Sequence, residues 1–396
     1  MRIRLELDES SKSKEKSIIY KEIFFMNSLG FNKPEKNTRV VVAMSGGVDS
    51  SVVACLLHEQ GFDVIGITLQ LYDIGDALKK KNACCAGVDI YDAKNIAEKF
   101  GFPHYVLNYQ NLFRESVIDD FVESYLGGET PIPCVKCNQS VKFRDLLKVA
   151  RDLGADALAT GHYVQRKVGE NGAAQLHKAV DDDKDQSYFL FTTTKEQIEF
   201  LRFPLGGNKK EKTREEAQRL GLTVANKPDS QDICFVPNGD YASVIRRHRP
   251  SAFKKGNLIH IETKKILGDH DGIINFTLGQ RRGLGIAYPE PLYVVKIDPV
   301  ENVVFVGEEK FLQNKKFVMR EINWLADDVD CTKEIHAKVR LRSNQEEAPA
   351  IIKFLADGRA EVVMKSMSRA ITPGQACVIY DDSRVLGGGW ITKEVE

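Results

Sequence analysis

The stretch Val-Val-Val-Ala-Met-Ser-Gly-Gly-Val-Asp-Ser, residues 40–50, decides the fold of this chain. An apolar run typical of a buried strand ends in a Ser-Gly-Gly turn, and a run typical of a helix follows over 51–60. Glycine lets the backbone approach an anion closely, and the first N–H groups of a helix have no partner within the helix. A strand, a glycine turn and a helix start in this order therefore predict a phosphate-binding cradle.

Strands and helices alternate outward from this stretch. The sequence predicts strands at 39–44, 63–71, 104–108 and 156–160, and helices at 50–60, 88–100, 112–125 and 138–153. Such alternation specifies an α/β fold with a doubly wound parallel sheet, which binds ligands at the carboxyl ends of its strands. The glycine turn and the later pair Gly161-His162 both follow strand ends, so we expect them at the same edge of the sheet.

The pattern changes after residue 205. A charged stretch at 206–219 and an irregular loop at 226–237 predict a small central connector domain, and closely spaced hairpins from 276 predict an antiparallel β-barrel. We therefore expect a charged, disordered N-terminal extension at 1–37, a nucleotide-binding catalytic domain at 38–205, a central connector at 206–275 and a C-terminal β-barrel at 276–396.

Composition narrows the class of protein. The 396 residues are 42% hydrophobic and 28% charged, as in an ordinary globular protein. The formal net charge is zero, which excludes a globally basic nucleic-acid binder but not a local basic face, such as the run at 246–255. No apolar run is long enough to span a membrane, and the first 25 residues lack a secretory signal. We therefore expect a cytoplasmic protein without a membrane partner.

The cradle differs from the commonest phosphate-binding loop. It has no Gly-Lys-Ser/Thr ending, so backbone amides and the hydroxyls of Ser45, Ser50 and Ser51 must hold the anion. Asp49 offers a carboxylate that can ligate Mg²⁺. The competing interpretation is a plain glycine turn between strand and helix, which the Asp-Ser directly after the turn disfavours.

Cysteines form the second group of interest. Eight cysteines in a chain expected to be cytoplasmic favour metal or redox chemistry over a disulfide framework. Cys137 precedes the predicted helix at 138–153, where the helix dipole, Lys136 and Lys142 are expected to lower its pKa and favour thiolate. Cys234 lies in the irregular loop. A thiolate near a nucleotide and a second, mobile cysteine suit a sulfur relay, in which one sulfur carries a persulfide and the other closes a disulfide behind it.

The pair Cys134-x-x-Cys137 by itself leaves other interpretations open. It is also typical of one half of a structural zinc site, or of an inert pair of thiols. The chain has no second Cys-x-x-Cys, which excludes a zinc ribbon with four cysteine ligands.

Six segments together resemble the bacterial tRNA-specific 2-thiouridylase family, within the PP-loop ATP pyrophosphatase superfamily. These segments are 43–51, 128–144, 159–163, 183–190, 229–237 and 277–286. The resemblance implies an ATP-dependent tRNA-uridine 2-sulfurtransferase. Such an enzyme adenylates the C2 carbonyl of the wobble uridine, and a cysteine persulfide then supplies sulfur to give 2-thiouridine. The resemblance also implies ATP and Mg²⁺ as cofactors and, as partners, the anticodon stem-loop of tRNA and a persulfide donor of a cysteine-desulfurase relay.

The same resemblance implies roles for individual residues. Cys137 is expected to be the nucleophile and Cys234 the persulfide carrier, with a disulfide between them during turnover. The residues expected to bind ATP are Ala43, Met44, Ser45, Gly46, Gly47, Val48, Asp49, Ser50, Leu69 and Gly161. Those expected to contact tRNA are Ile132 and Pro133, beside the target base, and His162, Lys184, Asp185, Gln186, Arg340 and Gln375.

One position departs from the family. Where much of the family has Asp, this chain has Cys134, so a carboxylate general base is absent there. One hypothesis is that Cys134, Cys137 and Cys234 ligate a 4Fe–4S cluster with one open iron. The other, which we favour, is that Cys134 is a helper thiol in the persulfide route.

Two other functions compete with sulfur transfer. A PP-loop amidotransferase or synthetase would use the same cradle with an amine nucleophile, but it gives no reason for Cys137 and Cys234. A non-enzymatic tRNA-binding or sulfur-carrier protein would explain the cysteines and the basic run but not the Ser-Gly-Gly-Val-Asp-Ser cradle.

Overall fold

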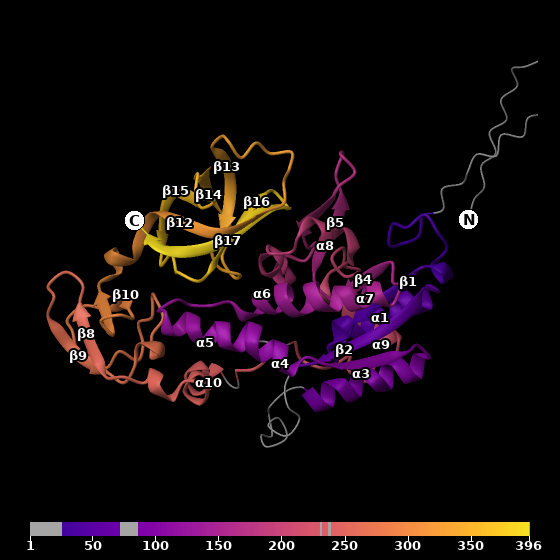
Figure 1. The fold of residues 1–396 in the computed structure, drawn as a ribbon, viewed down its shortest axis with the longest axis horizontal. Helices are drawn as coiled ribbons and strands as arrows, with labels where there is room; N and C mark the ends of the chain where they lie inside the picture. The colour runs from indigo at the N-terminus through magenta and orange to yellow at the C-terminus, as the bar shows by residue number, and fades with distance from the viewer. Residues whose placement is uncertain (1–25, 72–85, 230–231, 237–238, 396) are drawn as a thin grey trace, which may run out of the picture.

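The computed structural model describes residues 26–71, 86–229, 232–236 and 239–395. Three units are visible: an α/β unit, a smaller four-stranded sheet and a β-barrel (Figure 1). Residues 1–25 of the expected N-terminal extension lie outside the described residues. For 26–37 the expected disorder is wrong, because Leu29 packs in the core of the α/β unit and its carbonyl accepts a hydrogen bond from Arg202. No described helix is long and apolar enough to cross a membrane.

The α/β unit contains the predicted parallel sheet. Its strands are β1 (Arg39–Ala43), β2 (Asp63–Gln70), β3 (His104–Asn108), β4 (Ala157–Thr160) and the short β7 (Leu201–Arg202). They lie in the order β3-β2-β1-β4-β7, and every pairing is parallel. The doubly wound sheet predicted from the alternation of elements is therefore confirmed, and the carboxyl ends of β1 and β4 are neighbours.

Helices cover both faces of this sheet because every side chain in the middle of β1 is apolar. Val40 and Val42 pack in the core with α1 (Val48–Glu59), α3 (Ala86–Phe100) and α9 (Lys210–Arg219). Val41 points to the opposite face, which the helix at 133–152 covers. Alternate residues of a strand point to opposite faces, so a run of valines specifies a strand buried on both sides.

Two long helices follow β3. The first consists of α4 (Gln110–Phe113), a π-helical segment (Arg114–Ile118) and α5 (Asp119–Leu126). The second consists of α6 (Pro133–Cys137), a π-helical segment (Asn138–Leu146) and α7 (Leu147–Asp152). The predicted start of this helix at 138 is wrong, because the helix begins at Pro133. Proline suits the first helical position, where the missing N–H has no partner to lose.

The central unit has its own sheet. Its strands β8 (Gly256–His260), β9 (Ile266–His270), β10 (Tyr293–Asp298) and β11 (Val303–Gly307) lie in the order β10-β11-β8-β9, next to α10 (Tyr241–His248). The domain boundary predicted at 275–276 divides these paired strands. The hairpin at 293–307 therefore belongs with β8 and not with the barrel, because β11 pairs with β8 in parallel.

The C-terminal unit is a closed barrel of six strands, as predicted in kind. They are β12 (Gln313–Trp324), β13 (Ile335–Arg340), β14 (Ala348–Phe354), β15 (Ala360–Arg369), β16 (Ala376–Asp381) and β17 (Arg384–Val395), and β12 pairs with β17 to close it. A hairpin of the α/β unit, β5 (Val164–Val168) and β6 (Ala174–Lys178), extends from β17 and joins the two units.

The remaining elements are short. The helix α8 (Lys195–Phe200) is capped by Thr194, whose side chain accepts a hydrogen bond from the Gln197 backbone N–H in a capping box. Short 3₁₀ turns occur at Glu35–Asn37, Asp182–Lys184, Ser187–Leu190, Pro250–Ala252, Ile273–Asn275 and Glu309–Leu312.

Candidate functional site

The glycine turn at 45–50 joins the end of β1 to the start of α1. The Ser45 N–H donates to the Ser50 hydroxyl at 3.1 Å, and the two hydroxyl oxygens are 3.2 Å apart. Gly46 has a φ of +75°, and a Cβ there would lie 2.2 Å from the Asp89 carbonyl oxygen. Only glycine therefore fits this position, for both its backbone conformation and its space.

The predicted nucleotide residues outside the turn lie at neighbouring strand ends. A Cβ on Gly161, just after β4, would lie 2.8 Å from the Ser50 backbone nitrogen, so the two segments are in close contact. Leu69, near the end of β2, is partly buried. The glycine turn and Gly161 therefore lie together at one edge of the sheet, as predicted. A contact of Leu69 or Gly161 with adenine stays a prediction.

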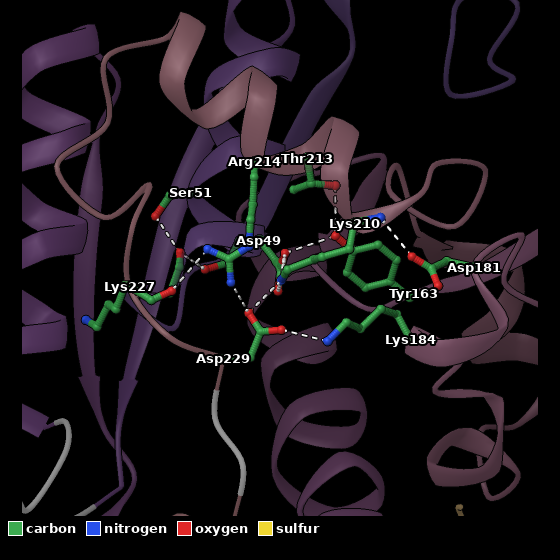
Figure 2. A network of polar contacts seen from close by, with 12 residues as sticks. Asp49, Ser51, Tyr163, Asp181, Lys184, Lys210, Thr213, Arg214, Lys227 and Asp229 are labelled. Carbon is green, nitrogen blue, oxygen red and sulfur yellow. Dashed lines mark hydrogen bonds and ion pairs between the residues drawn. The ribbon is translucent and has the colours of Figure 1, made fainter.

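Two lysines from distant segments reach the glycine turn. Figure 2 shows the first of them, Lys210, beside Asp49. The Lys210 ammonium donates to both carboxylate oxygens of Asp49, at 2.6 and 2.8 Å, and lies 3.0 Å from Asp229. The Lys227 ammonium donates to the Gly46 carbonyl oxygen at 3.0 Å. The cradle lacks a lysine in its own sequence, and the fold supplies two from elsewhere.

Asp229 lies at the centre of this network. Its carboxylate accepts hydrogen bonds from Lys184 at 2.9 Å and from Arg214 at 3.0 Å, in addition to the ion pair with Lys210. Burial raises the pKa of the Asp229 carboxyl, but the hydrogen bonds from Lys184 and Lys210 outweigh burial and leave the pKa below its usual value.

Lys227 pairs with two carboxylates of α3, those of Asp89 and Asp92.

Sequence reasoning missed this network. Lys210 stands among other charged residues of a charge-rich helix, so nothing in the local pattern marks it. Lys227 and Asp229 begin the irregular loop that contains Cys234, and that neighbourhood was the one available signal. Both carboxylate oxygens of Asp49 accept hydrogen bonds from Lys210, so neither is available in this arrangement as a ligand for Mg²⁺. The Mg²⁺ role of Asp49 stays a prediction.

The structure brings the predicted cysteines together. Cys137 is buried in a small apolar cluster with Phe113, and Phe235, the residue after Cys234, packs against the same cluster. Leu69 also packs there, which places the cluster beside the sheet edge that holds the glycine turn. Cys134, on the first turn of the same helix, is exposed, and so is Cys234.

The predicted activation of Cys137 is wrong. Cys137 lies at the end of α6, inside the helix that begins at Pro133, so it does not precede the helix N-terminus. Burial raises the pKa of the Cys137 thiol to about 12; Lys142 acts in the opposite direction, and the nearby Cys234 and Cys134 add to the rise. The resting group is therefore a neutral thiol.

The iron–sulfur hypothesis gains no support from the fold. Among the described residues, no group of three or more His, Cys, Asp or Glu side chains is placed to hold a metal ion. Cys134, Cys137 and Cys234 influence one another electrostatically, but they do not form a ligand set. The persulfide route therefore stays the favoured hypothesis for these thiols.

Several residues predicted to contact tRNA are engaged within the protein. Asp185 is 1% exposed and pairs with Arg340 at 2.9 Å, which joins the α/β unit to β13 of the barrel. The Gln186 side chain accepts from the Tyr163 N–H at 2.9 Å. The structure gives Asp185 and Arg340 a role between the units, and their contact with tRNA stays a prediction.

Other predicted tRNA residues lie near the cysteines. Ile132 and Pro133 begin the helix of Cys137, and Ile132 lines a cavity of about 90 Å³ together with Lys136 and Trp390. The Gln375 side chain donates to the carbonyl of residue 130 at 2.8 Å and ties the barrel to the same segment. The predicted target-base segment is therefore held between α5 and the barrel.

His162 and Lys184 complete the predicted set. Desolvation, with a smaller effect of the Lys142 ammonium, lowers the pKa of the partly accessible His162 ring to about 3, so the imidazole is neutral. Its Nδ1 lies 2.9 Å from the Thr160 hydroxyl. The Lys184 ammonium is held by Asp229. Of the local basic run, Arg249 pairs with Glu123 and is thus partly neutralised.

A parallel sheet, a glycine turn at its carboxyl edge and no turn lysine define a nucleotide-binding α/β domain of the PP-loop kind. Family models match three regions: a "tRNA methyl transferase HUP domain" at 38–238, a "tRNA methyl transferase PRC-barrel domain" at 242–308 and an "Aminomethyltransferase beta-barrel domain" at 314–391.

Curated relatives match nearly the whole chain. The tRNA-specific 2-thiouridylase MnmA of Rickettsia conorii is 61% identical over 364 residues, which cover 92% of this chain and 98% of the relative. The protein of the same name from Rickettsia massiliae is also 61% identical, with 92% and 99% covered. The chain belongs to the tRNA-specific 2-thiouridylase family.

A solved 4-thiouridine synthetase–RNA complex with bound ATP is 16% identical, covers 54% of this chain and 51% of its own, and has a TM-score of 0.32. A likeness this weak carries no argument about the present chain. The family-model descriptions name methyl transfer and the curated relatives name thiolation. The cysteine cluster beside the glycine turn favours thiolation.

Proposed function

We propose that this protein is an ATP-dependent tRNA-uridine 2-sulfurtransferase. The observation that carries the proposal is the juxtaposition of a phosphate cradle at 45–50 with the cluster of Cys137, against which Phe235 and Leu69 pack. An adenylating site needs the cradle, and sulfur delivery needs the thiols. The competing amine-dependent synthetase needs only the cradle and leaves the thiols without a role.

The first step is activation of the uridine. ATP binds with its phosphates on the amides of the glycine turn, near the ammonium groups of Lys210 and Lys227. The O2 of the wobble uridine attacks the α-phosphate, the bond to the β-phosphate breaks, and pyrophosphate leaves. Mg²⁺ bound with the phosphates would neutralise part of their charge. The product carries AMP on the C2 oxygen, so C2 becomes open to a nucleophile.

The second step inserts sulfur. The terminal sulfur of a persulfide on Cys234 attacks C2, and the C–O bond to AMP breaks. Cys137 sulfur then attacks the Cys234 sulfur, which releases 2-thiouridine and leaves a Cys137–Cys234 disulfide; the Cys137 proton passes to solvent. Two electrons from a thiol reductant reopen the disulfide. A cysteine persulfide donor recharges Cys234, and Cys134 serves as a neighbouring helper thiol.

The base must leave its stack to reach the site. An anticodon loop allows this at low cost because its bases are already unpaired. Ile132, at the start of the Cys137 helix, lines the small cavity that the target-base segment shares with the barrel. The proposal therefore places the wobble uridine between the glycine turn and α6.

Reconstitution tests the proposal. Purified protein is mixed with ATP, Mg²⁺, unmodified tRNA and a persulfide donor, and the digested tRNA is analysed by mass spectrometry. We expect 2-thiouridine, and pyrophosphate release that requires tRNA. Pyrophosphate release that requires ammonia or an amine instead would favour the synthetase alternative. Methylated uridine formed from a methyl donor would favour the activity named by the family models.

A further inference from the structure

Lys142 lies five residues after Cys137 on the second long helix, in its π-helical segment Asn138–Leu146. A π-helix bonds residues five positions apart, so Cys137 and Lys142 follow one another along one face. In an α-helix the two side chains would point about 140° apart. Burial raises the pKa of the Cys137 thiol, and the Lys142 ammonium opposes this rise, which agrees with its placement on the thiol side of the helix.

The Lys142 side chain is partly buried and carries a charge without a counter-ion. Among the residues that the structure describes, no group accepts a hydrogen bond from its ammonium or pairs with it. Lys136, on the same helix, instead pairs with Asp120 at 3.6 Å and lies over the Trp390 ring. A partly buried cation without a partner costs free energy, and an anion bound beside it removes that cost. Lys142 is therefore suited to bind an anionic ligand.

The neighbours of Lys142 connect it to the glycine turn. The ring of Phe143, the next residue, meets the His162 ring edge to face, with centroids 5.8 Å apart. His162 directly follows Gly161, where a Cβ would lie 2.8 Å from the Ser50 backbone nitrogen. The Lys142 ammonium also acts electrostatically on the His162 ring. Lys142 thus lies where the phosphate-binding edge of the sheet approaches the cysteine cluster.

We propose that Lys142 is a catalytic residue whose ammonium binds the α-phosphate of ATP and, after adenylation, the phosphate of AMP on the uridine. The inference rests on the proposed sulfur transfer. In adenylated uridine, C2, O2 and the α-phosphorus are joined by consecutive bonds, so a cation beside the thiols that serve C2 also lies beside this phosphate. When the C–O bond breaks, its electron pair stays on AMP. The ammonium stabilises that charge and keeps its own proton.

The kinetics of Lys142→Met test this role. The variant loses no hydrogen bond among the described residues, so it should fold. We expect kcat for tRNA-dependent pyrophosphate release to fall about 100-fold, the scale of one lost charge-stabilising donor. The KM for ATP should change little, because the glycine turn still holds the other phosphates. Lys142→Arg should restore part of the rate.

Lys148→Met is the matched control, because Lys148 is an exposed lysine six residues later on the same helix. Its rates should equal those of the wild type. If Lys142→Met lowers thiolation alone and leaves pyrophosphate release unchanged, Lys142 acts on the thiols, and its assignment to the α-phosphate is overturned.

ATP with sulfur in place of one α-phosphate oxygen tests the contact directly. Sulfur is a weak hydrogen-bond acceptor, so the wild type should use one of the two stereoisomers more slowly than ATP. In Lys142→Met this ratio of rates should shrink by about tenfold, as expected for two groups in contact. A ratio that is the same in both proteins, for both stereoisomers, would overturn the proposal.

Labelling of the unaltered protein keeps the proposal testable if Lys142→Met does not fold. Lysines are acetylated with ATP alone or tRNA alone present at about ten times its Kd, which leaves about a tenth of the sites free. ATP alone should therefore slow labelling of Lys142 about tenfold and leave Lys148 unchanged, as measured by peptide mass spectrometry. Protection by tRNA and not by ATP would assign Lys142 to a backbone phosphate of tRNA and would overturn the proposal.

The proposed function fails separately. If wild-type protein makes no 2-thiouridine in the reconstitution, the sulfurtransferase proposal falls, while protection by ATP still reports the contact of Lys142 with the nucleotide. If 2-thiouridine forms and Lys142→Met releases pyrophosphate at the wild-type rate, only the role of Lys142 falls.

Discussion

At the scale of single residues, Cys137 separates what local sequence can predict from what the fold decides. Its place in the candidate site could be predicted from motifs, and its pairing with Cys234 stays a prediction. Its ionisation could not be predicted, because the helix begins at Pro133 and buries the thiol among apolar side chains. A thiol that rests in the neutral form is protected from oxidation and alkylation, since the thiolate is the reactive species.

The raised pKa of Cys137 predicts the pH dependence of its alkylation. Below its pKa of about 12, the thiolate fraction of Cys137 grows with pH. Labelling by iodoacetamide should therefore rise roughly tenfold per pH unit from pH 7 to 10, with no plateau. Peptide mass spectrometry of the labelled protein gives the rates. A plateau near pH 7 would show a stabilised thiolate and would contradict the structure.

At the scale of elements, the glycine turn works because α3 packs over it. The turn could be predicted from residues 40–50 alone, and its phosphate role stays a prediction. Lys210 and Lys227 could not, because cations at 160 or more residues' distance are brought to the turn only by the tertiary fold. The helix start at Pro133 was also missed. Two prolines close together, Pro131 and Pro133, are typical of a loop when only the local sequence is considered.

Two neighbouring glycines predict opposite responses to alanine. Gly46→Ala places a Cβ against the Asp89 backbone at a φ of +75°, so we expect a loss of about 1–3 kcal/mol in the free energy of unfolding and weaker ATP binding. Gly47→Ala meets only the Ser45 hydroxyl at 3.5 Å and should change stability by less than about 0.5 kcal/mol. Urea unfolding and ATP titration measure both; equal losses would contradict the packing described.

At the scale of the whole molecule, a shared apolar cluster, a β-hairpin and buried polar contacts join the α/β unit to the barrel. The β5–β6 hairpin extends the barrel sheet, and Arg340 links Asp185 of the α/β unit to Glu347 of the barrel. The three-unit order could be predicted from the change in pattern along the chain. The boundary near 276 could not, because β11 pairs with a strand about 45 residues earlier, which no local pattern reveals.

The junction residue Arg340 predicts a large stability effect. Arg340→Met leaves the buried Asp185 carboxylate without its cation, which should cost about 3–5 kcal/mol of the free energy of unfolding. Arg359→Met is the matched control in the same barrel, because Arg359 also has two carboxylate partners but they are exposed. Its loss should be below about 1 kcal/mol. Comparable losses in the two variants, measured by urea unfolding, would mean that the junction pair does not hold the units together.

The central claim is that the cradle activates the uridine and that Cys234 supplies the sulfur. Cys234→Ser tests it most directly, with 2-thiouridine and pyrophosphate measured in the same reaction. The variant should make no 2-thiouridine while tRNA-dependent pyrophosphate release continues, because the glycine turn and its lysines are untouched. Thiolation that persists in Cys234→Ser would contradict the assignment of the persulfide to this residue.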